Sequence, residues 1–350
     1  MVENIRQFSL KELEARFKTQ GIEPYRARQV FGWLYDKGVE DFSSMTNLSR
    51  ALQEKLASFY FIEKPEIVRI ATSRDLTQKF VFRLTDGALI ESVSIPAKSR
   101  LTACLSTQVG CKFGCLFCVS GAGGFRRNLT TAEILSQLIA IRRHVPDGHV
   151  SNIVFMGIGE PLDNYAPLMK AVRILNDALG VHLGARKFTV STAGFVPGID
   201  KLGQEGMQLE LSVSLHAATD EKRSQLMPIN RRYPLKDLMA AVRRYILATK
   251  RKVTFEYVLL GGYNTLVEDA EALCRLLRGT NARVNLIPYN PGASRTAFEA
   301  PTKLEVLFFK SYLVKKGLDV TLRVSRGVDI AAACGQLRSA VTQEKRDHGA

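Results

Sequence analysis

The sequence of 350 residues has no long apolar run. No segment approaches the ~18 uncharged apolar residues that a membrane-spanning helix needs. The first six residues, Met1-Val-Glu-Asn-Ile-Arg6, also lack the apolar core of a secretory signal peptide. A membrane protein and a secreted protein are therefore not expected, and we predict a cytoplasmic monomer that does not bind membranes.

Cysteine is scarce, and its spacing does not match a disulfide framework. The chain has six cysteines, three of them close together and the others scattered. Small secreted domains instead carry dense and regularly spaced cysteines. The pattern fits a reducing compartment, where thiols stay free for chemistry or for metal binding.

Acidic residues are too few to balance the basic ones. The chain has 34 Asp and Glu against 49 Lys and Arg, which gives a formal charge of +15. Because contacts of Lys and Arg with phosphates dominate nucleic-acid affinity, this excess favours an RNA or DNA partner over an acidic small molecule. A merely basic surface would have the same composition, so charge alone leaves both interpretations open.

Three of the six cysteines lie in one short stretch. Their spacing, Cys111-x3-Cys115-x2-Cys118, brings three thiolates to one loop, where they can bind a single iron–sulfur cluster. Since an iron–sulfur cube has four corners, three protein ligands leave one iron open to a small molecule. Two alternatives stay open at this point: a structural zinc with Cys104 as the fourth ligand, and a disulfide within the loop.

The first part of the chain indicates two small regions. Residues 1–63 are predicted to form a helical domain, in which Ser9 and Glu12 have the capping-box spacing that starts a helix. Residues 64–99 change to the two-residue period of strands and contain Asp86-Gly87 as a turn signal, so a β-hairpin connector is predicted.

From about residue 100 to 340, strand and helix patterns alternate, which predicts parallel strands joined by helical crossovers. We expect strands near 101–107, 152–157, 187–192, 209–215, 253–260, 283–287 and 319–324. We expect helices near 130–143, 163–178, 198–204, 235–248, 267–278 and 302–316. Six units are too few for a closed eight-stranded barrel, so the prediction is an α/β fold with a partial (β/α)6 barrel. Residues 341–350 are polar and are predicted to be a disordered tail.

Polar and glycine motifs follow the predicted strands. The residues concerned are Gly157, Gly159, Glu160, Ser191, Ser214, His216 and Asn290. Because the carboxyl ends of parallel strands face one side of a barrel, these residues and the cysteine loop are expected to meet at one mouth. For the Gly-x-Gly-Glu segment a plain turn is the alternative, and a lone histidine at a strand end is usually structural.

These motifs carry a resemblance to known proteins. Cys-x3-Cys-x2-Cys, with an aromatic residue (Phe117) before the last cysteine, is similar to the signature of the radical S-adenosylmethionine (SAM) superfamily. Seven blocks, in order, resemble the dual-specificity ribosomal and transfer RNA methyltransferases that methylate C2 of adenine. The blocks are residues 104–111, 124–129, 155–162, 214–217, 226–231, 285–291 and 332–337. The similarity runs from about residue 5 to about residue 340.

The resemblance implies cofactors and partners. It implies a [4Fe-4S] cluster on Cys111, Cys115 and Cys118, with SAM at the open iron and a radical SAM barrel around both. The implied SAM-binding residues are Gly159, Glu160, Ser191, Ser214, Leu215, His216 and Asn290. The implied substrates are 23S ribosomal RNA and transfer RNA, which the N-terminal domain helps to grip. An electron donor such as flavodoxin or ferredoxin would reduce the cluster.

The resemblance also implies a two-stage methyl transfer. One SAM methylates Cys334, and a second is cleaved to a 5′-deoxyadenosyl radical that removes hydrogen from this methyl group, so that the carbon radical adds to adenine. Glu91 would then remove the C2 proton. Cys104 would attack the thioether of Cys334, which releases methylated RNA and leaves a disulfide. Without the resemblance, Glu91 is most simply a solvated strand carboxylate and the two cysteines are inert.

Two other functions stay open. A sister enzyme methylates C8 of adenine and confers antibiotic resistance, although the blocks at 159–162 and 286–291 are more similar to the C2 group. A non-catalytic RNA-binding protein, with a structural zinc or an inert iron–sulfur cluster, is the alternative from a different class. Such a protein would not consume SAM.

Overall fold

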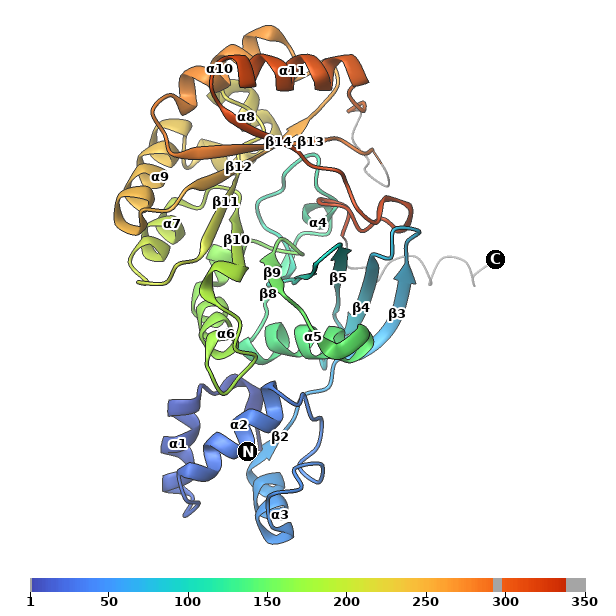
Figure 1. Ribbon diagram of the computed structural model, residues 1–350, viewed down its shortest axis with the longest axis vertical. Helices are drawn as coiled ribbons and strands as arrows, with labels where there is room; N and C mark the ends of the chain where they lie inside the picture. The colour runs from blue at the N-terminus through green and yellow to red at the C-terminus, as the bar shows by residue number, and fades with distance from the viewer. Residues whose placement is uncertain (1, 292–297, 338–350) are drawn as a thin grey trace.

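A ten-stranded sheet forms the frame of the protein (Figure 1). It is described from a computed structural model that covers residues 2–291 and 298–337. Its strand order is β14-β13-β12-β11-β10-β9-β6-β5-β4-β3. The tail predicted over 341–350 lies outside the described residues.

Seven neighbouring strands of this sheet are parallel. They are β6 (Arg100–Cys104), β9 (Asn152–Phe155), β10 (Phe188–Thr192), β11 (Glu210–Ser214), β12 (Val253–Leu259), β13 (Ala282–Pro288) and β14 (Asp319–Leu322). The helices between them are α5 (Thr131–His144), α6 (Tyr165–Asn176), α7 (Val196–Gly203), α9 (Leu235–Thr249), α10 (Val267–Leu277) and α11 (Lys303–Lys315). Within the described chain this succession makes six strand–helix units, with the helices on the outer side of the strands (Figure 1). The predicted partial (β/α)6 barrel is confirmed.

The inner face of the parallel strands is polar. Alternate residues of β11 and β12 are buried and apolar, and they pack under the helices. On the other face, the carboxylate of Glu256 accepts hydrogen bonds from Ser212 Oγ (2.8 Å) and Asn285 Nδ2 (3.2 Å). Thr321 of β14 continues this row by donating to Asn285. The barrel therefore encloses a polar interior below the carboxyl ends of its strands.

Three antiparallel strands extend the sheet past β6. They are β3 (Glu66–Thr72), β4 (Gln78–Arg83) and β5 (Leu89–Ala97). β5 pairs directly with β6, with Val93 opposite Cys104. The region predicted as a connector is thus continuous with the barrel sheet, which local alternation could not show because it predicts a strand but not its partner. The domain boundaries themselves stay predictions.

A small helical unit lies at one end of the barrel (Figure 1). It contains α1 (Leu10–Thr19), α2 (Tyr25–Tyr35), α3 (Arg50–Phe59), β1 (Glu3–Asn4) and β2 (Tyr60–Phe61). Ser9 and Glu12 form the predicted capping box. The buried guanidinium of Arg6 donates to Glu63 O (2.6 Å) and to Ser136 Oγ of α5 (3.3 Å), and Arg142 of α5 donates to Tyr35 O (2.6 Å). These bonds dock the unit onto α5.

Between β6 and β12, two short strands and two short helices were not predicted. They are β7 (Gln108–Gly110), β8 (Phe125–Asn128), α4 (Val119–Ala122) and α8 (Asp220–Leu226). β7 and β8 form a separate antiparallel pair between β6 and α5, and the cysteine loop lies between them. The strand expected over 101–107 therefore ends at Cys104, before the loop begins. Within residues 2–291 and 298–337, every helix is too short or too polar to span a bilayer.

Candidate functional site

The cysteine loop holds three partly buried thiols, those of Cys111, Cys115 and Cys118. Burial raises the pKa of Cys111 to about 12. Burial, followed by the charges of Cys118 and Cys111, raises the pKa of Cys115 well above its usual range. Thiols that are buried together and repel one another as thiolates need a cation to be deprotonated. The donor set therefore fits a bound cluster of iron.

Apolar side chains and one strained turn shape this loop. Gly110 has a φ of +75°, and a Cβ there would lie 1.8 Å from the carbonyl oxygen of Gly124. The ring of Phe117 packs edge-on against the imidazole of His216, with 4.6 Å between centroids. The amide of Leu116 donates to the carbonyl of Leu226 at the end of α8 (2.9 Å). The loop is thus fixed against the carboxyl end of the barrel.

Cys104 does not join the loop. It is buried at the end of β6, in an apolar cluster with Val93 and Ala332. Burial, and after it the charge of Cys334, raises the pKa of Cys104 to about 12. These surroundings do not support the zinc alternative that used Cys104 as the fourth ligand. Among the described residues, the three thiols of the loop included, no three or more His, Cys, Asp or Glu form a group that could hold a single metal ion, and all six cysteines are free thiols, so the loop contains no disulfide.

Glu160 is a buried carboxylate at the end of β9. Its oxygens accept hydrogen bonds from the amides of Ala193 (2.7 Å) and Leu162 (3.2 Å). Burial outweighs these bonds and raises the pKa of Glu160 to about 7. Before it, Gly159 has a φ of +105°, and a Cβ there would lie 2.5 Å from Cβ of Gln108. The plain-turn alternative does not explain why the Glu160 carboxylate is buried. A buried carboxylate can accept hydrogen bonds from the ammonium group of a ligand.

His216 is buried at the end of β11 and is neutral. Burial lowers its pKa to about 3, and its Nδ1 accepts a hydrogen bond from the amide of Val258 (3.0 Å). The proton of the neutral ring is therefore on Nε2, which makes this nitrogen a donor. The other predicted binding residues lie at or just after the carboxyl ends of parallel strands: Ser191 is the last residue but one of β10, Ser214 ends β11 and precedes the buried Leu215, and Asn290 follows β13.

Sequence reasoning missed Arg223 of α8, which is fully buried. Its guanidinium donates to the carbonyls of Ala193 (2.7 Å) and Ser214 (3.1 Å) and to Asn230 Oδ1 (2.7 Å). Burial lowers its pKa to about 10. Arg223 thus joins the ends of β10 and β11, where SAM-binding residues are predicted. Its segment, Asp220–Leu226, is mostly charged, which indicates an exposed helix and gave no signal of this role.

Glu91 is buried rather than solvated, so the simple expectation of a solvated strand carboxylate is wrong. Only 2% of its surface is exposed, and its Oε1 lies 3.4 Å from Nζ of Lys79 on β4. Val93 lies two residues further along β5, on the same face as Glu91, and it is paired with Cys104 on β6. The structure therefore brings Glu91 and Cys104 to the same inner face.

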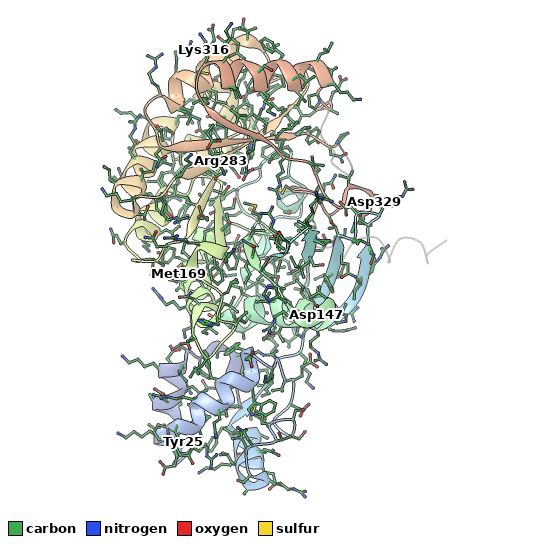
Figure 2. The ribbon with its side chains drawn as sticks, in the orientation of Figure 1. Tyr25, Asp147, Met169, Arg283, Lys316 and Asp329 are labelled. Carbon is green, nitrogen blue, oxygen red and sulfur yellow. The ribbon has the colours of Figure 1, made fainter. Side chains whose placement is uncertain are left out.

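The segment 323–337, which we call the strap, carries Cys334 across this face. Gly335 of the strap accepts a hydrogen bond from the amide of Val119, next to the last cysteine of the loop (2.8 Å). At the other end, Asp329 accepts from Ser73 Oγ at the β3–β4 turn (2.5 Å), and Figure 2 shows Asp329 at this end of the sheet. Cys334 is exposed and close enough to interact electrostatically with Cys104. The strap thus brings Cys334 beside the cysteine loop and near Cys104.

Comparison with known proteins agrees with this geometry. Residues 3–62 match the Ribosomal RNA large subunit methyltransferase N-terminal domain, and residues 105–277 match the Radical SAM superfamily. The "Dual-specificity RNA methyltransferase RlmN" of Syntrophus aciditrophicus (strain SB) is 46% identical over 343 residues, which are 98% of this chain and 98% of that relative. The chain belongs to the RlmN family.

Other members of the RlmN family, and one solved structure, match over a similar length. The relative of the same name from Geotalea uraniireducens (strain Rf4) is 45% identical over 344 residues, covering 98% of this chain and 99% of its own. A crystal structure of a radical SAM methyltransferase from Sphaerobacter thermophilus is 45% identical, with a TM-score of 0.92, and the match covers 96% of this chain and 99% of that one. The predicted fold is therefore confirmed, and so are the [4Fe-4S] cluster and SAM that the superfamily implies.

Proposed function

We propose that this RlmN-family protein methylates C2 of adenine in 23S ribosomal RNA and in transfer RNA, through a methylated Cys334. Its family makes it a radical SAM RNA methyltransferase. The dual specificity in the names of its relatives supports the two substrates. The observation that carries the proposal is that the strap, bonded to the cysteine loop, brings Cys334 near Cys104, on a sheet face that also carries the buried carboxylate of Glu91.

When bound, the cluster and SAM supply a 5′-deoxyadenosyl radical, which can remove hydrogen from a methyl group. Cys111, Cys115 and Cys118 would hold the cluster. The Glu160 carboxylate would accept hydrogen bonds from the amino group of SAM. The Nε2–H group of His216 would donate a hydrogen bond to SAM. Gly159, Ser191, Ser214, Leu215 and Asn290 complete the proposed SAM site. A donor such as flavodoxin or ferredoxin would supply the electron.

The two thiols have different surroundings, which suit different roles. Cys334 is exposed and lies near Arg323, whose pKa is raised chiefly by the charge of Cys334. An exposed thiol beside a guanidinium is suited to accept a methyl group from SAM. Cys104 is buried with a pKa of about 12, so it stays protonated at neutral pH and does not compete for this methyl group. Cys104 is the proposed resolving thiol and Glu91 the proposed proton acceptor.

The roles of the two thiols are tested by trapping the protein on RNA. In Cys104→Ala the methyl carrier still adds to adenine, but no thiol cleaves the bond. We expect the variant to accumulate on RNA, seen as a nuclease-sensitive shift on a denaturing gel. The shift should be absent in Cys104→Ala/Cys334→Ala. Cys274→Ala, which removes a thiol on the remote helix α10, is the matched control and should turn over normally.

Normal turnover of Cys104→Ala, or an adduct that persists without Cys334, would overturn the assignment of the two thiols. The position of methylation is measured separately. RNA modified by the wild-type protein is digested to nucleosides and compared with 2-methyladenosine and 8-methyladenosine by mass spectrometry and chromatography. We expect 2-methyladenosine in both RNAs, and 8-methyladenosine would contradict the proposal of C2.

A further inference from the structure

Lys79 lies in a place where lysine is seldom found. On β4 it is paired with Val93, while Val81 is paired with Glu91, so Lys79 and Glu91 are diagonal neighbours on one face of the sheet. Their side chains are only 14% and 3% exposed, and Nζ lies 3.4 Å from Oε1. Lysine is almost never this buried unless it is paired. The pair therefore needs an explanation beyond the stability of the sheet.

The same ammonium has a second partner in the strap. Nζ of Lys79 donates to the carbonyl oxygen of Ala331 (3.3 Å), three residues before Cys334. Ala331 has a φ of +52°, a conformation that alanine rarely adopts. The Lys79 ammonium thus contacts both the turn that precedes Cys334, the proposed methyl carrier, and Glu91, the proposed proton acceptor.

Lys79 is not needed to keep the strap in place. Asp329 accepts from Ser73 Oγ (2.5 Å), and the amide of Gly327 donates to Asp75 Oδ2 (3.1 Å). The backbone of β4 is fixed independently, because Phe80 and Phe82 on its other face belong to the main apolar core. Loss of the ammonium would therefore remove this contact with the Glu91 carboxylate without releasing the strap.

We propose that Lys79 is a positioning residue for methyl transfer, which keeps Glu91 ionised and fixes its position relative to Cys334. A positive charge beside a carboxylate favours the ionised form and so opposes the effect of burial. An ionised carboxylate is the form that can accept the C2 proton. The inference rests on the proposed function, since it takes Glu91 as the proton acceptor and Cys334 as the carrier.

The test separates methylation of the carrier from transfer to RNA. Anaerobically reconstituted full-length Lys79→Met is given SAM and RNA. Methylation of Cys334 is measured by the mass of its peptide, and methylated RNA and covalent adduct are measured on denaturing gels. We expect Cys334 methylation to stay within about threefold of wild type and RNA methylation to fall roughly 100-fold, the size of a positioning effect. Adduct should accumulate although Cys104 is present.

Three further variants make this test more specific. Lys79→Arg retains the charge and should recover at least about a tenth of wild-type RNA methylation. Arg83→Met is the matched control, because Arg83 lies on the same face of β4 and pairs with Glu66 at 3.3 Å, but both side chains are exposed (48% and 59%). It should behave as wild type. Lys79→Met/Glu91→Gln should be no slower than Glu91→Gln alone, since both changes remove one function.

Normal RNA methylation by Lys79→Met would overturn the inference. So would an equal loss of iron, Cys334 methylation and RNA methylation, since that pattern indicates support of the fold only. Failure of the proposed function looks different: the wild-type protein itself would then leave Cys334 unmethylated, or Cys104→Ala would form no adduct. Additive effects of Lys79→Met and Glu91→Gln would also exclude positioning through Glu91.

Discussion

The two halves of the barrel mouth are built by different means. In the half that we assign to SAM, backbone groups and close packing set the geometry: Gly159 fits against Gln108, and amides and carbonyls hold Glu160 and Arg223. In the half that we assign to methyl transfer, charged side chains such as Asp75 and Asp329 hold a strap against the sheet. We therefore expect that a single substitution in the methyl-transfer half can slow RNA methylation without changing SAM cleavage. A substitution in the SAM half should reduce both.

The largest effect is expected from Cys115→Ala. Wild-type protein reconstituted without oxygen should hold about four irons per chain, as the cube stoichiometry requires. The variant loses one of the three proposed protein ligands, so we expect iron content to collapse and SAM cleavage and RNA methylation to become undetectable. Cys274→Ala should retain both iron and activity. A fully loaded and active Cys115→Ala would contradict the cluster assignment, and stoichiometric zinc in place of iron would end the radical mechanism.

Gly159→Ala should weaken the binding of SAM, on which both activities depend. The added Cβ would lie 2.5 Å from Cβ of Gln108, on a backbone with a φ of +105°. Overpacking and strain of this kind cost about 1–3 kcal/mol each, so SAM affinity should fall roughly 30-fold or more. Equilibrium dialysis with labelled SAM measures the change. Gly262→Ala is the control because Gly262 also has a positive φ (+67°) but faces open space. Unchanged SAM affinity in Gly159→Ala would show that the site is packed less tightly than described.

Asp329→Ala should damage the transfer half alone. The carboxylate accepts from Ser73 Oγ (2.5 Å) and from the amide of Arg74 (3.2 Å), and both bonds are lost in the variant. A strap that is less well held should slow RNA methylation roughly 10-fold. Reductive cleavage of SAM, measured as 5′-deoxyadenosine in the absence of RNA, should change by less than about twofold. If both activities fall together, the two halves are not independent.

The smallest effect concerns pH. The raised pKa of Glu160, about 7, means that this carboxyl group takes up a proton as the pH falls from 8 to 6. The neutral group no longer attracts the ammonium of SAM, so affinity should fall with decreasing pH, by at most about tenfold per pH unit below 7. His216, with a pKa of about 3, stays neutral throughout this range. Glu160→Gln should bind SAM more weakly with little dependence on pH, and a flat wild-type profile would contradict the proposed contact.

The SAM half was largely predictable from sequence because its signals are local. Alternation predicted each parallel strand, a capping box at Thr130 and Glu133 starts α5, and residues that end parallel strands must meet at one face. The transfer half depends on contacts far apart in the chain. Ser73 and Asp329 are 256 residues apart, and no local pattern specifies that β5 pairs with β6. For this reason the burial of Glu91 and its pairing with Lys79 were not predicted.

The docking of the N-terminal unit by Arg6 and Arg142 has a consequence for how RNA would be chosen. Because both guanidinium groups join this unit to α5, any RNA segment that the unit grips is held at a constant span from the mouth. Under the proposed function, an adenine would then be modified when it lies at this distance from the gripped segment, whatever the sequence between them. Two RNAs of unrelated sequence can meet this condition if their folds hold an adenine at the same distance from the gripped segment.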